Sequence, residues 1–297
     1  MAKVIITGGT GLVGRRLTTL LENSGWQVSI LCRKPAKPNE YAWDINRQTM
    51  DEKVLEGATA IIHLAGAGIA DERWTDRRKQ EIVDSRVQSA KLINSYLQKY
   101  PHTISHFISA SAVGYYGDRG EEWLTENSSP GTGFVAEVCT AWEAAADALQ
   151  SATVKVSKVR IGIVLSKDGG ALPKLALPVK MGIGATMGNG KQYMPWIHID
   201  DLCGIFRFLL EHPEKNGIYN ACAPNVCTQQ ELMKDIATVL HRPYIPFPVP
   251  AAVLKLGMGE MAGIVLMSNR CEAGKISAAG YPFIYTTAKG ALLAVYS

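Results

Sequence analysis

The chain has 297 residues, of which 47% are hydrophobic and 20% charged, and its formal net charge is +4 at pH 7. This length allows a large core, and the modest charge, spread in both signs along the chain, argues against a nucleic-acid-binding stripe. The sequence shows no signal peptide, no good membrane span and no Cys/His cluster with metal-ligand spacing, so we expect a cytoplasmic protein without a metal, whose six cysteines stay reduced.

The first 165 residues alternate short apolar runs with helical patterns. Strands are expected at residues 4–6, 28–31, 60–64, 106–109 and 154–164. Helices are expected at residues 12–24, 76–99 and 134–150. Alternation of this kind predicts a parallel sheet with helices on both faces. The expected fold class is therefore α/β, a Rossmann-like doubly wound parallel sheet with a small C-terminal substrate lobe.

Beyond residue 165 glycines and prolines become frequent, which predicts a loop with one intervening helix, followed by helices near 200–211 and 229–241. The apolar stretch 251–267 contains charged residues and three glycines, which indicates a core or interface helix. The expected organisation is a Rossmann domain at 1–165 with returning segments at about 195–225, substrate-lobe elements at 166–250, and a small C-terminal module at 251–297.

A glycine-rich loop lies between the first strand and the first helix. It satisfies the pattern GxGxxG through Gly9, Gly11 and Gly14, and a GxxGxxG pattern that starts at Gly8. Such a loop makes a tight turn, lets the backbone approach a pyrophosphate, and presents the N–H groups of a helix N-terminus to the anion. We expect a dinucleotide to contact the whole loop: Gly8, Gly9, Thr10, Gly11, Leu12, Val13 and Gly14. The alternative is a tight strand–helix turn with no ligand.

The end of the second strand indicates which dinucleotide is bound. An Asp or Glu there would hold the ribose 2′-hydroxyl of NAD, but the chain has Arg33 and no carboxylate before Glu40. A guanidinium binds a 2′-phosphate in a bidentate manner. The sequence therefore favours NADP(H), unless Arg33 and Lys34 are merely a solvated pair.

The motifs together resemble the extended short-chain dehydrogenase/reductase superfamily and, within it, the YfcH-like epimerase-family proteins. The resemblance covers nearly the whole chain and is carried by Thr7–Gly11, His63–Gly66, Ile69–Trp74, Gly114–Asp118, Trp142-Glu143 and Pro195–Asp201. It implies NADP(H) held by the phosphate loop, by Cys32 and Arg33, and by Leu64 and Ala65 beside the adenosine. It also implies that Glu81, Arg86 and Glu143 lie near the cofactor.

Two points qualify this resemblance. In an alternative interpretation, Glu81 and Arg86 are solvent-facing residues of a charged helix and do not contact the cofactor. Relatives often read Asn-Leu-Ala-Gly-Glu where this chain has His63-Leu64-Ala65-Gly66-Ala67, so any contact of that Glu is absent here.

The catalytic groups usual in the superfamily are missing at their expected positions. A Tyr and a Lys four residues later normally handle the proton, but alignment on Trp142-Glu143 places Phe134 and Val138 there. The usual serine aligns with Ala112. The substitute candidates are Ser111, Tyr115 and Tyr116, although both tyrosines are alternatively packing residues. A Tyr-x-x-x-Lys match at 285–289 lies near the C-terminus and is taken as chance.

The second lobe offers candidate substrate contacts: Lys191 in a glycine-rich loop, Trp196 for stacking, and His198, which is alternatively a structural histidine. Two functions stay open. The first is an NADP(H)-dependent oxidoreductase or epimerase acting on an unidentified small carbonyl or sugar-type substrate. The second is a non-catalytic NADP(H)-binding protein that reports redox state. Because the stretch 76–99 is highly charged, we expect a monomer or a weak homodimer.

Overall fold

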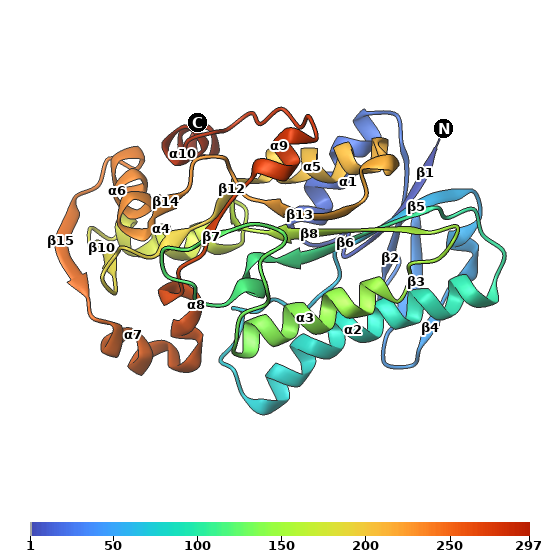
Figure 1. Cartoon of the computed structure of the whole chain (residues 1–297), viewed down its shortest axis with the longest axis horizontal. Helices are drawn as coiled ribbons and strands as arrows, with labels where there is room; N and C mark the ends of the chain where they lie inside the picture. Colours follow the sequence, from blue (N-terminus) through green and yellow to red (C-terminus); the bar gives the residue numbers. More distant parts are fainter. Residues whose placement is uncertain (1) are drawn as a thin grey trace.

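The computed structural model describes residues 2–297, and its main sheet has eight strands in the order β13-β8-β6-β5-β1-β2-β3-β4 (Figure 1). These strands are β1 (Lys3–Thr7), β2 (Gln27–Cys32), β3 (Glu40–Asp44), β4 (Thr49–Met50), β5 (Ala58–His63), β6 (His106–Ala112), β8 (Lys155–Ile161) and β13 (Gly217–Ala221). All neighbouring strands pair in parallel except β3 and β4. The expected Rossmann-like doubly wound fold is confirmed.

Helices cover both faces of this sheet. One face carries α1 (Leu12–Asn23) and α5 (Ile199–Glu211), and the other carries α2 (Asp76–Lys99) and α3 (Phe134–Asp147) (Figure 1). The strand β1 contributes apolar side chains to both faces of the sheet. Val4 and Ile6 belong to the core under α1 and α5, and Ile5 belongs to the core under α2 and α3. A strand apolar on both faces needs a helical layer on each side.

The chain order creates a ligand crevice beside β1. From β1 the chain runs first to β2 on one side, and it later enters β5 on the other side of β1. In open parallel sheets a ligand binds outside the carboxyl ends of the strands where the strand order reverses in this way. The glycine-rich loop and the loop after His63 both leave the sheet at that point.

A second lobe packs around its own core. Its helices are α4 (Ala171–Lys180), α6 (Gln229–Val239) and the C-terminal α10 (Ala288–Tyr296), and its strand pairs are β9–β12, β10–β15 and β11–β14. The strands are β9 (Ile163–Leu165), β10 (Gly184–Met187), β11 (Tyr193–Met194), β12 (Trp196–His198), β14 (Cys227–Thr228) and β15 (Tyr244–Val249). The remaining elements are β7 (Trp123–Leu124), β16 (Arg270–Cys271), α9 (Gly274–Ala278), η1 (Glu52–Leu55), η2 (Val113–Tyr116) and η3 (Pro213–Lys215).

The stretch 251–267 was expected to form a core or interface helix, and it does not form one continuous helix. It is divided into α7 (Ala251–Met258), the 3-10 turn η4 (Gly259–Met261) and α8 (Ala262–Leu266), and α7 has no buried residue. Gly259 has a φ of +62°, a backbone conformation that interrupts the helix. Among residues 2–297 no helix is long and apolar enough to span a membrane.

Candidate functional site

The glycine-rich loop adopts the close approach that its sequence predicts. Gly8 has a φ of +69°, and a Cβ on it would lie 2.9 Å from the backbone of Leu64. A Cβ on Gly14 would lie 2.2 Å from the carbonyl oxygen of Gly8. Side chains at these two positions would therefore force the loop away from β5 or from the first turn of α1.

The N-terminus of α1 is open to an anion. Gly11 is the N-cap and supplies no side-chain cap, so the first N–H groups of α1 stay available. The loop borders a cavity of about 490 Å³ whose walls come from the loop, the end of β2 and the segment after β5. Its lining residues include Gly8, Thr10, Gly11, Cys32, Arg33, Leu64, Ala65, Gly66, Asp71, Glu72, Arg78 and Glu81. A free helix N-terminus facing such a cavity fits a dinucleotide pyrophosphate.

Arg33 follows the end of β2 and lines this cavity. It is exposed and also borders an adjoining hollow lined by Asn46, Gln48 and Arg77. Glu40, the first carboxylate after β2, accepts a hydrogen bond from the Ala36 N–H at 2.7 Å. Glu40 thus holds the loop after Arg33 in place and is absent from the cavity lining, so neither β2 nor the loop after it places a carboxylate beside Arg33. Glu81 of α2 borders both hollows together with Arg33.

His63, the last residue of β5, connects the end of β1 to α2. Its Nδ1 lies 2.8 Å from the Thr7 hydroxyl, and its Nε2 lies 3.1 Å from the Ser89 hydroxyl. Thr7 Oγ1 also accepts the N–H groups of Leu64 and Ala65, both at 3.1 Å, so its own proton points to His63. Complete burial lowers the pKa of His63 to about 4, and the ring is therefore a neutral structural bridge.

Glu81 and Arg86 lie at different depths. Glu81 lines the cavity and pairs with Arg78 at 2.8 Å. Arg86 is buried deeper, donates to the carbonyl of Ala67 at 3.0 Å, and stacks on Trp142 at 4.8 Å. Arg86 therefore supports the loop that borders the cavity, and a direct cofactor contact for it stays a prediction.

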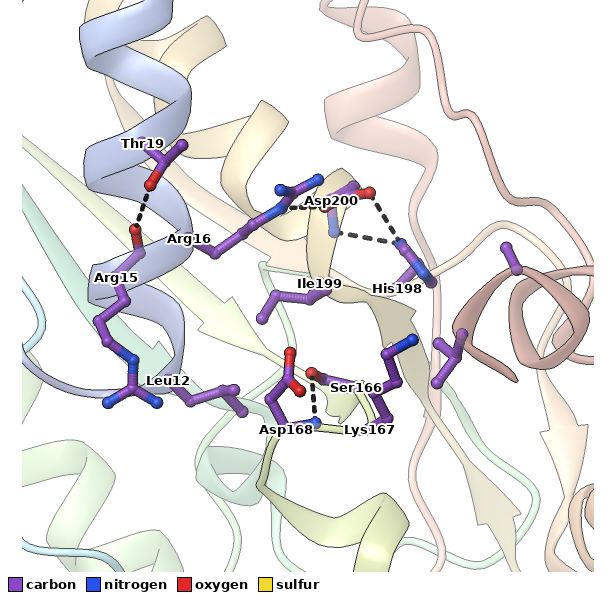
Figure 2. A pocket seen from close by; sticks show the side chains of 12 residues that line it. Leu12, Arg15, Arg16, Thr19, Ser166, Lys167, Asp168, His198, Ile199 and Asp200 are labelled. Atoms are coloured by element: carbon purple, nitrogen blue, oxygen red, sulfur yellow. Dashed lines mark hydrogen bonds and ion pairs between the residues drawn. The ribbon is translucent and has the colours of Figure 1, made fainter. Parts of the chain in front are cut away.

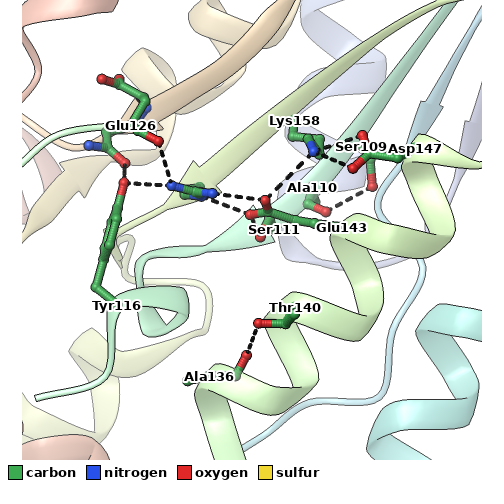
Figure 3. A network of polar contacts seen from close by, with 12 residues as sticks. Ser109, Ala110, Ser111, Tyr116, Glu126, Ala136, Thr140, Glu143, Asp147 and Lys158 are labelled. Atoms are coloured by element: carbon green, nitrogen blue, oxygen red, sulfur yellow. Dashed lines mark hydrogen bonds and ion pairs between the residues drawn. The ribbon is translucent and has the colours of Figure 1, made fainter. Parts of the chain in front are cut away.

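Glu143 belongs to a buried polar network between α3 and the sheet (Figure 3). Arg160 donates to both of its carboxylate oxygens, at 2.8 and 2.9 Å, and Ser111 donates to it at 2.7 Å. Arg160 also donates to the Tyr116 hydroxyl at 2.9 Å, and that hydroxyl donates to Asn220 at 2.6 Å. Burial raises the pKa of Tyr116. The network therefore already uses the hydroxyls of Ser111 and Tyr116.

Tyr115 is the candidate whose hydroxyl lies outside this buried network, unlike those of Ser111 and Tyr116. Its side chain is half-buried, and the Arg160 guanidinium lies 3.5 Å from the centre of its ring. No hydrogen bond within residues 2–297 uses its hydroxyl, which stays free for a ligand.

Phe134 occupies the usual position of the catalytic tyrosine, at the start of α3. Its ring packs edge-to-face on Trp74 at 4.8 Å, and the Lys79 ammonium lies 5.5 Å from the ring centre. Val138 is buried. This position thus offers an aromatic surface beside a cation, with no group on Phe134 or Val138 that transfers a proton.

The three expected substrate contacts in the second lobe do not converge. Trp196 is completely buried and donates its indole N–H to Asn225, so its ring belongs to the lobe's core and has no face for stacking on a ligand. Lys191 is exposed on the loop before β11. His198 accepts the N–H of Asp200 at 3.1 Å, which makes it the N-cap of α5, and burial lowers its pKa.

His198 also borders a second pocket, of about 520 Å³, which lies beside α1 (Figure 2). Arg16 and Asp200 pair across this pocket at 2.6 Å, and Arg15 donates to the carbonyl of Thr10 at 2.6 Å. None of the loop glycines lines it. The structural interpretation of His198 fits these contacts better than the role in substrate binding.

The six cysteines are free, and five of them are buried. Burial raises the pKa of each thiol, to about 12 for Cys139, Cys203 and Cys227. At neutral pH they are therefore protonated packing groups.

Several functional residues lack a clear local signal. Trp74 and Lys79 come next to Phe134 only through the fold. Arg160 is 1% exposed and already engaged with Glu143, Tyr116 and the Glu126 carbonyl. The sequence does contain a signal for the ion pairs of this network. Lys158 and Arg160 are two residues apart and share one face of a strand, while Glu143 and Asp147 are four apart and share one face of a helix.

Comparisons with known proteins agree with this geometry. The model of the NAD dependent epimerase/dehydratase family matches residues 4–222, and that of DUF1731, a domain of unknown function, matches residues 249–295. The crystal structure of human epimerase family protein SDR39U1 (isoform 2) with NADPH superposes with a TM-score of 0.91 at 31% identity, over 99% of this chain and 98% of that chain.

Two further relatives are similar along the whole chain. The crystal structure of the nucleoside-diphosphate sugar epimerase from Corynebacterium glutamicum has a TM-score of 0.81 at 34% identity, and it covers 98% of this chain and 57% of that chain. The chloroplastic SDR39U1 homologue of Arabidopsis thaliana is 34% identical over 301 residues, covering 98% of this chain and 86% of its own length.

Proposed function

Because the chain belongs to the NAD dependent epimerase/dehydratase family, we propose that it binds NADP(H) in the cavity beside the glycine-rich loop. The observation that carries this proposal is that the open N-terminus of α1 and the guanidinium of Arg33 border one cavity. The glycine-rich loop would hold the pyrophosphate, Arg33 the 2′-phosphate, and Leu64 and Ala65 the adenosine side. The human relative crystallised with NADPH supports the choice of cofactor.

Calorimetry with purified protein tests this proposal. NADPH should bind at least roughly tenfold more tightly than NADH, because a charge-assisted contact to the 2′-phosphate is worth about 1.5–3 kcal/mol. Equal affinities for the two cofactors would contradict the role of Arg33.

For the reaction, we propose an NADP(H)-dependent oxidoreductase or epimerase with a non-standard active site. NADP(H), when bound, supplies or accepts a hydride, so the chain itself must hold or move the proton. Phe134 carries no such proton, and the hydroxyls of Ser111 and Tyr116 are already used inside the buried network. Tyr115 keeps a free hydroxyl, and Arg160 fixes the orientation of its ring. We assign the proton to Tyr115 Oη and the substrate class to small carbonyl or sugar-type compounds.

A panel of aldehydes, ketones and sugar nucleotides with NADPH tests this assignment. Loss of general acid–base catalysis should slow turnover of Tyr115→Phe by 10²–10⁴-fold. The variant Phe134→Ala should keep its turnover, because Phe134 transfers no proton. The variant Tyr116→Phe should chiefly lose stability, because the Tyr116 hydroxyl lies in the buried network. Full turnover in Tyr115→Phe would show that another group handles the proton.

A second candidate function is a non-catalytic NADP(H)-binding protein that reports redox state to a partner. Phe134 and Val138 at the positions of the usual acid–base pair favour it. Tight NADPH binding, absence of turnover across the whole panel, and different amide-exchange patterns with NADPH and NADP⁺ would support this alternative. The cytoplasmic location expected from the sequence is likewise a proposal, which cell fractionation tests.

A further inference from the structure

The C-terminal stretch matched by the domain of unknown function consists of two differently held parts. We define the base as residues 261–297 and the arm as residues 251–260, which comprise α7 and the start of η4. We propose that the arm is a clasp on the segment that borders the proposed NADP(H) cavity, and that this clasp must open for the cofactor to enter or leave. This proposal rests on the proposed cofactor function.

The base is firmly fixed to the rest of the molecule. The buried Asp201 carboxylate of α5 accepts the Tyr281 hydroxyl and the N–H groups of Ile284 and Tyr285, at 2.9–3.1 Å. The helix α10 packs on α6 within the core of the second lobe. Met261 and Ala262, where the base begins, are buried. Buried contacts of this density make local opening of the base costly.

The arm, by contrast, buries none of its side chains. Leu256 is 86% exposed and Val253 is 55% exposed. Two polar contacts join the arm to the Rossmann domain in the described part of the chain: Arg73 donates to the Gly257 carbonyl at 2.7 Å, and Lys79 pairs with Glu260 at 2.5 Å. Glu260 is 66% exposed, so its ion pair is weak and screened by salt. The arm is thus the part of this stretch that opens most easily.

Both contacts of the arm end on the segment that borders the cavity. Arg73 directly follows Asp71 and Glu72, which line the cavity, and Lys79 lies between the lining residues Arg78 and Glu81. From the second lobe, Lys174 of α4 donates to the Ala70 carbonyl of the same segment at 2.6 Å. In Figure 1, α7 and α8 lie on the side of the molecule where α2 and α3 begin. The arm and α4 therefore hold residues 66–81 in place from outside the Rossmann domain.

The geometry also provides a pivot for the arm. Gly259 has a φ of +62° and lies two residues before the buried Met261, while β15, paired with β10, precedes the arm. Rotation at Gly259 would carry α7 and the Gly257 carbonyl away from Arg73, and the exposed Glu260 side chain would leave Lys79 by turning into solvent, without disturbing the base. The function that we infer for the arm is to set the rate of cofactor exchange.

Stopped-flow measurement of NADPH release tests the clasp. The variant Glu260→Gln removes the ion pair and should speed release about two- to fivefold. Glu260→Lys, which repels Lys79, should speed release further, and the charge swap Lys79→Glu/Glu260→Lys should restore slow release. Raising the salt concentration should speed release from the wild type but not from Glu260→Gln. The matched control Glu211→Gln removes the exposed Arg207–Glu211 pair on α5 and should leave the release rate unchanged.

Amide hydrogen exchange without cofactor provides an independent readout. The clasp predicts faster exchange of residues 66–81 in Glu260→Lys than in Glu211→Gln, with equal melting temperatures. Wild-type release rates and unchanged exchange in Glu260→Lys would overturn the clasp. Failure of the wild type to bind NADPH would refute the proposed cofactor instead, while the exchange experiment would still decide whether the arm holds the segment.

Discussion

Removal of the Arg160 side chain should destabilise the protein strongly. Arg160 is 1% exposed and makes a bidentate contact with Glu143, which is 5% exposed. In Arg160→Met the Glu143 carboxylate keeps the Ser111 hydroxyl and, at 3.8 Å, Lys158. Leaving a buried charge without its partner costs about 3–5 kcal/mol. With an unfolding entropy of about 2.1 cal/mol/K per residue, this loss lowers the melting temperature by about 5–8 °C.

A double-mutant cycle measured by urea unfolding checks the cause of this loss. If the unpaired charge is responsible, the double variant Arg160→Met/Glu143→Met should recover at least about 2 kcal/mol relative to the sum of the two single variants. A loss below about 1 kcal/mol in Arg160→Met, or strict additivity in the cycle, would refute the reasoning.

Three further predictions concern the cofactor, the pH dependence and the assembly. Arg33→Ala should weaken NADPH binding by about one to two decades and leave NADH binding unchanged, as calorimetry can show. Because burial lowers the pKa of His63 to about 4, against about 6.5 in an unfolded chain, stability should be complete above pH 6.5. It should fall as the pH drops from 6.5 to 4, by up to about 3 kcal/mol. Urea titrations should show a shallower fall in His63→Asn, and identical slopes would contradict the bridge. Light scattering should show a monomer or a weak dimer, since the exposed face of α2 is charged; a dimer persisting at sub-micromolar concentration would contradict this.

The sequence predicted the elements whose pattern is local. The helix at 12–24, the charged helix at 76–99 and the loop between Gly8 and Gly14 are observed nearly where they were expected, because periodicity and turn glycines act over a few residues. The membership in the extended superfamily, inferred from motifs along the whole chain, is confirmed by the family match.

The elements that depend on distant partners were missed or altered. β13 was not predicted as a separate strand, because its short sequence becomes a strand by pairing with β8, far earlier in the chain. The strand candidate at 154–164, whose pattern Arg160 and Gly162 interrupt, is divided at Gly162, where a Cβ would lie 2.3 Å from the Pro195 carbonyl oxygen. For the site, Trp196 was expected to stack on a ligand but is buried in the core of the second lobe. An aromatic residue in a short strand suits a core as well as a ligand site, and the local sequence does not distinguish the two.

The state of the thiols limits how this protein responds to oxidants. With pKa values near 12, Cys139, Cys203 and Cys227 have about one thiolate in 10⁵ molecules at pH 7. Peroxide and alkylating reagents attack thiolates, so these three cysteines of the folded chain should react slowly with both at concentrations that modify ordinary surface cysteines. A response to the redox state of the cell is therefore expected to pass through the ratio of reduced to oxidised dinucleotide rather than through these three thiols.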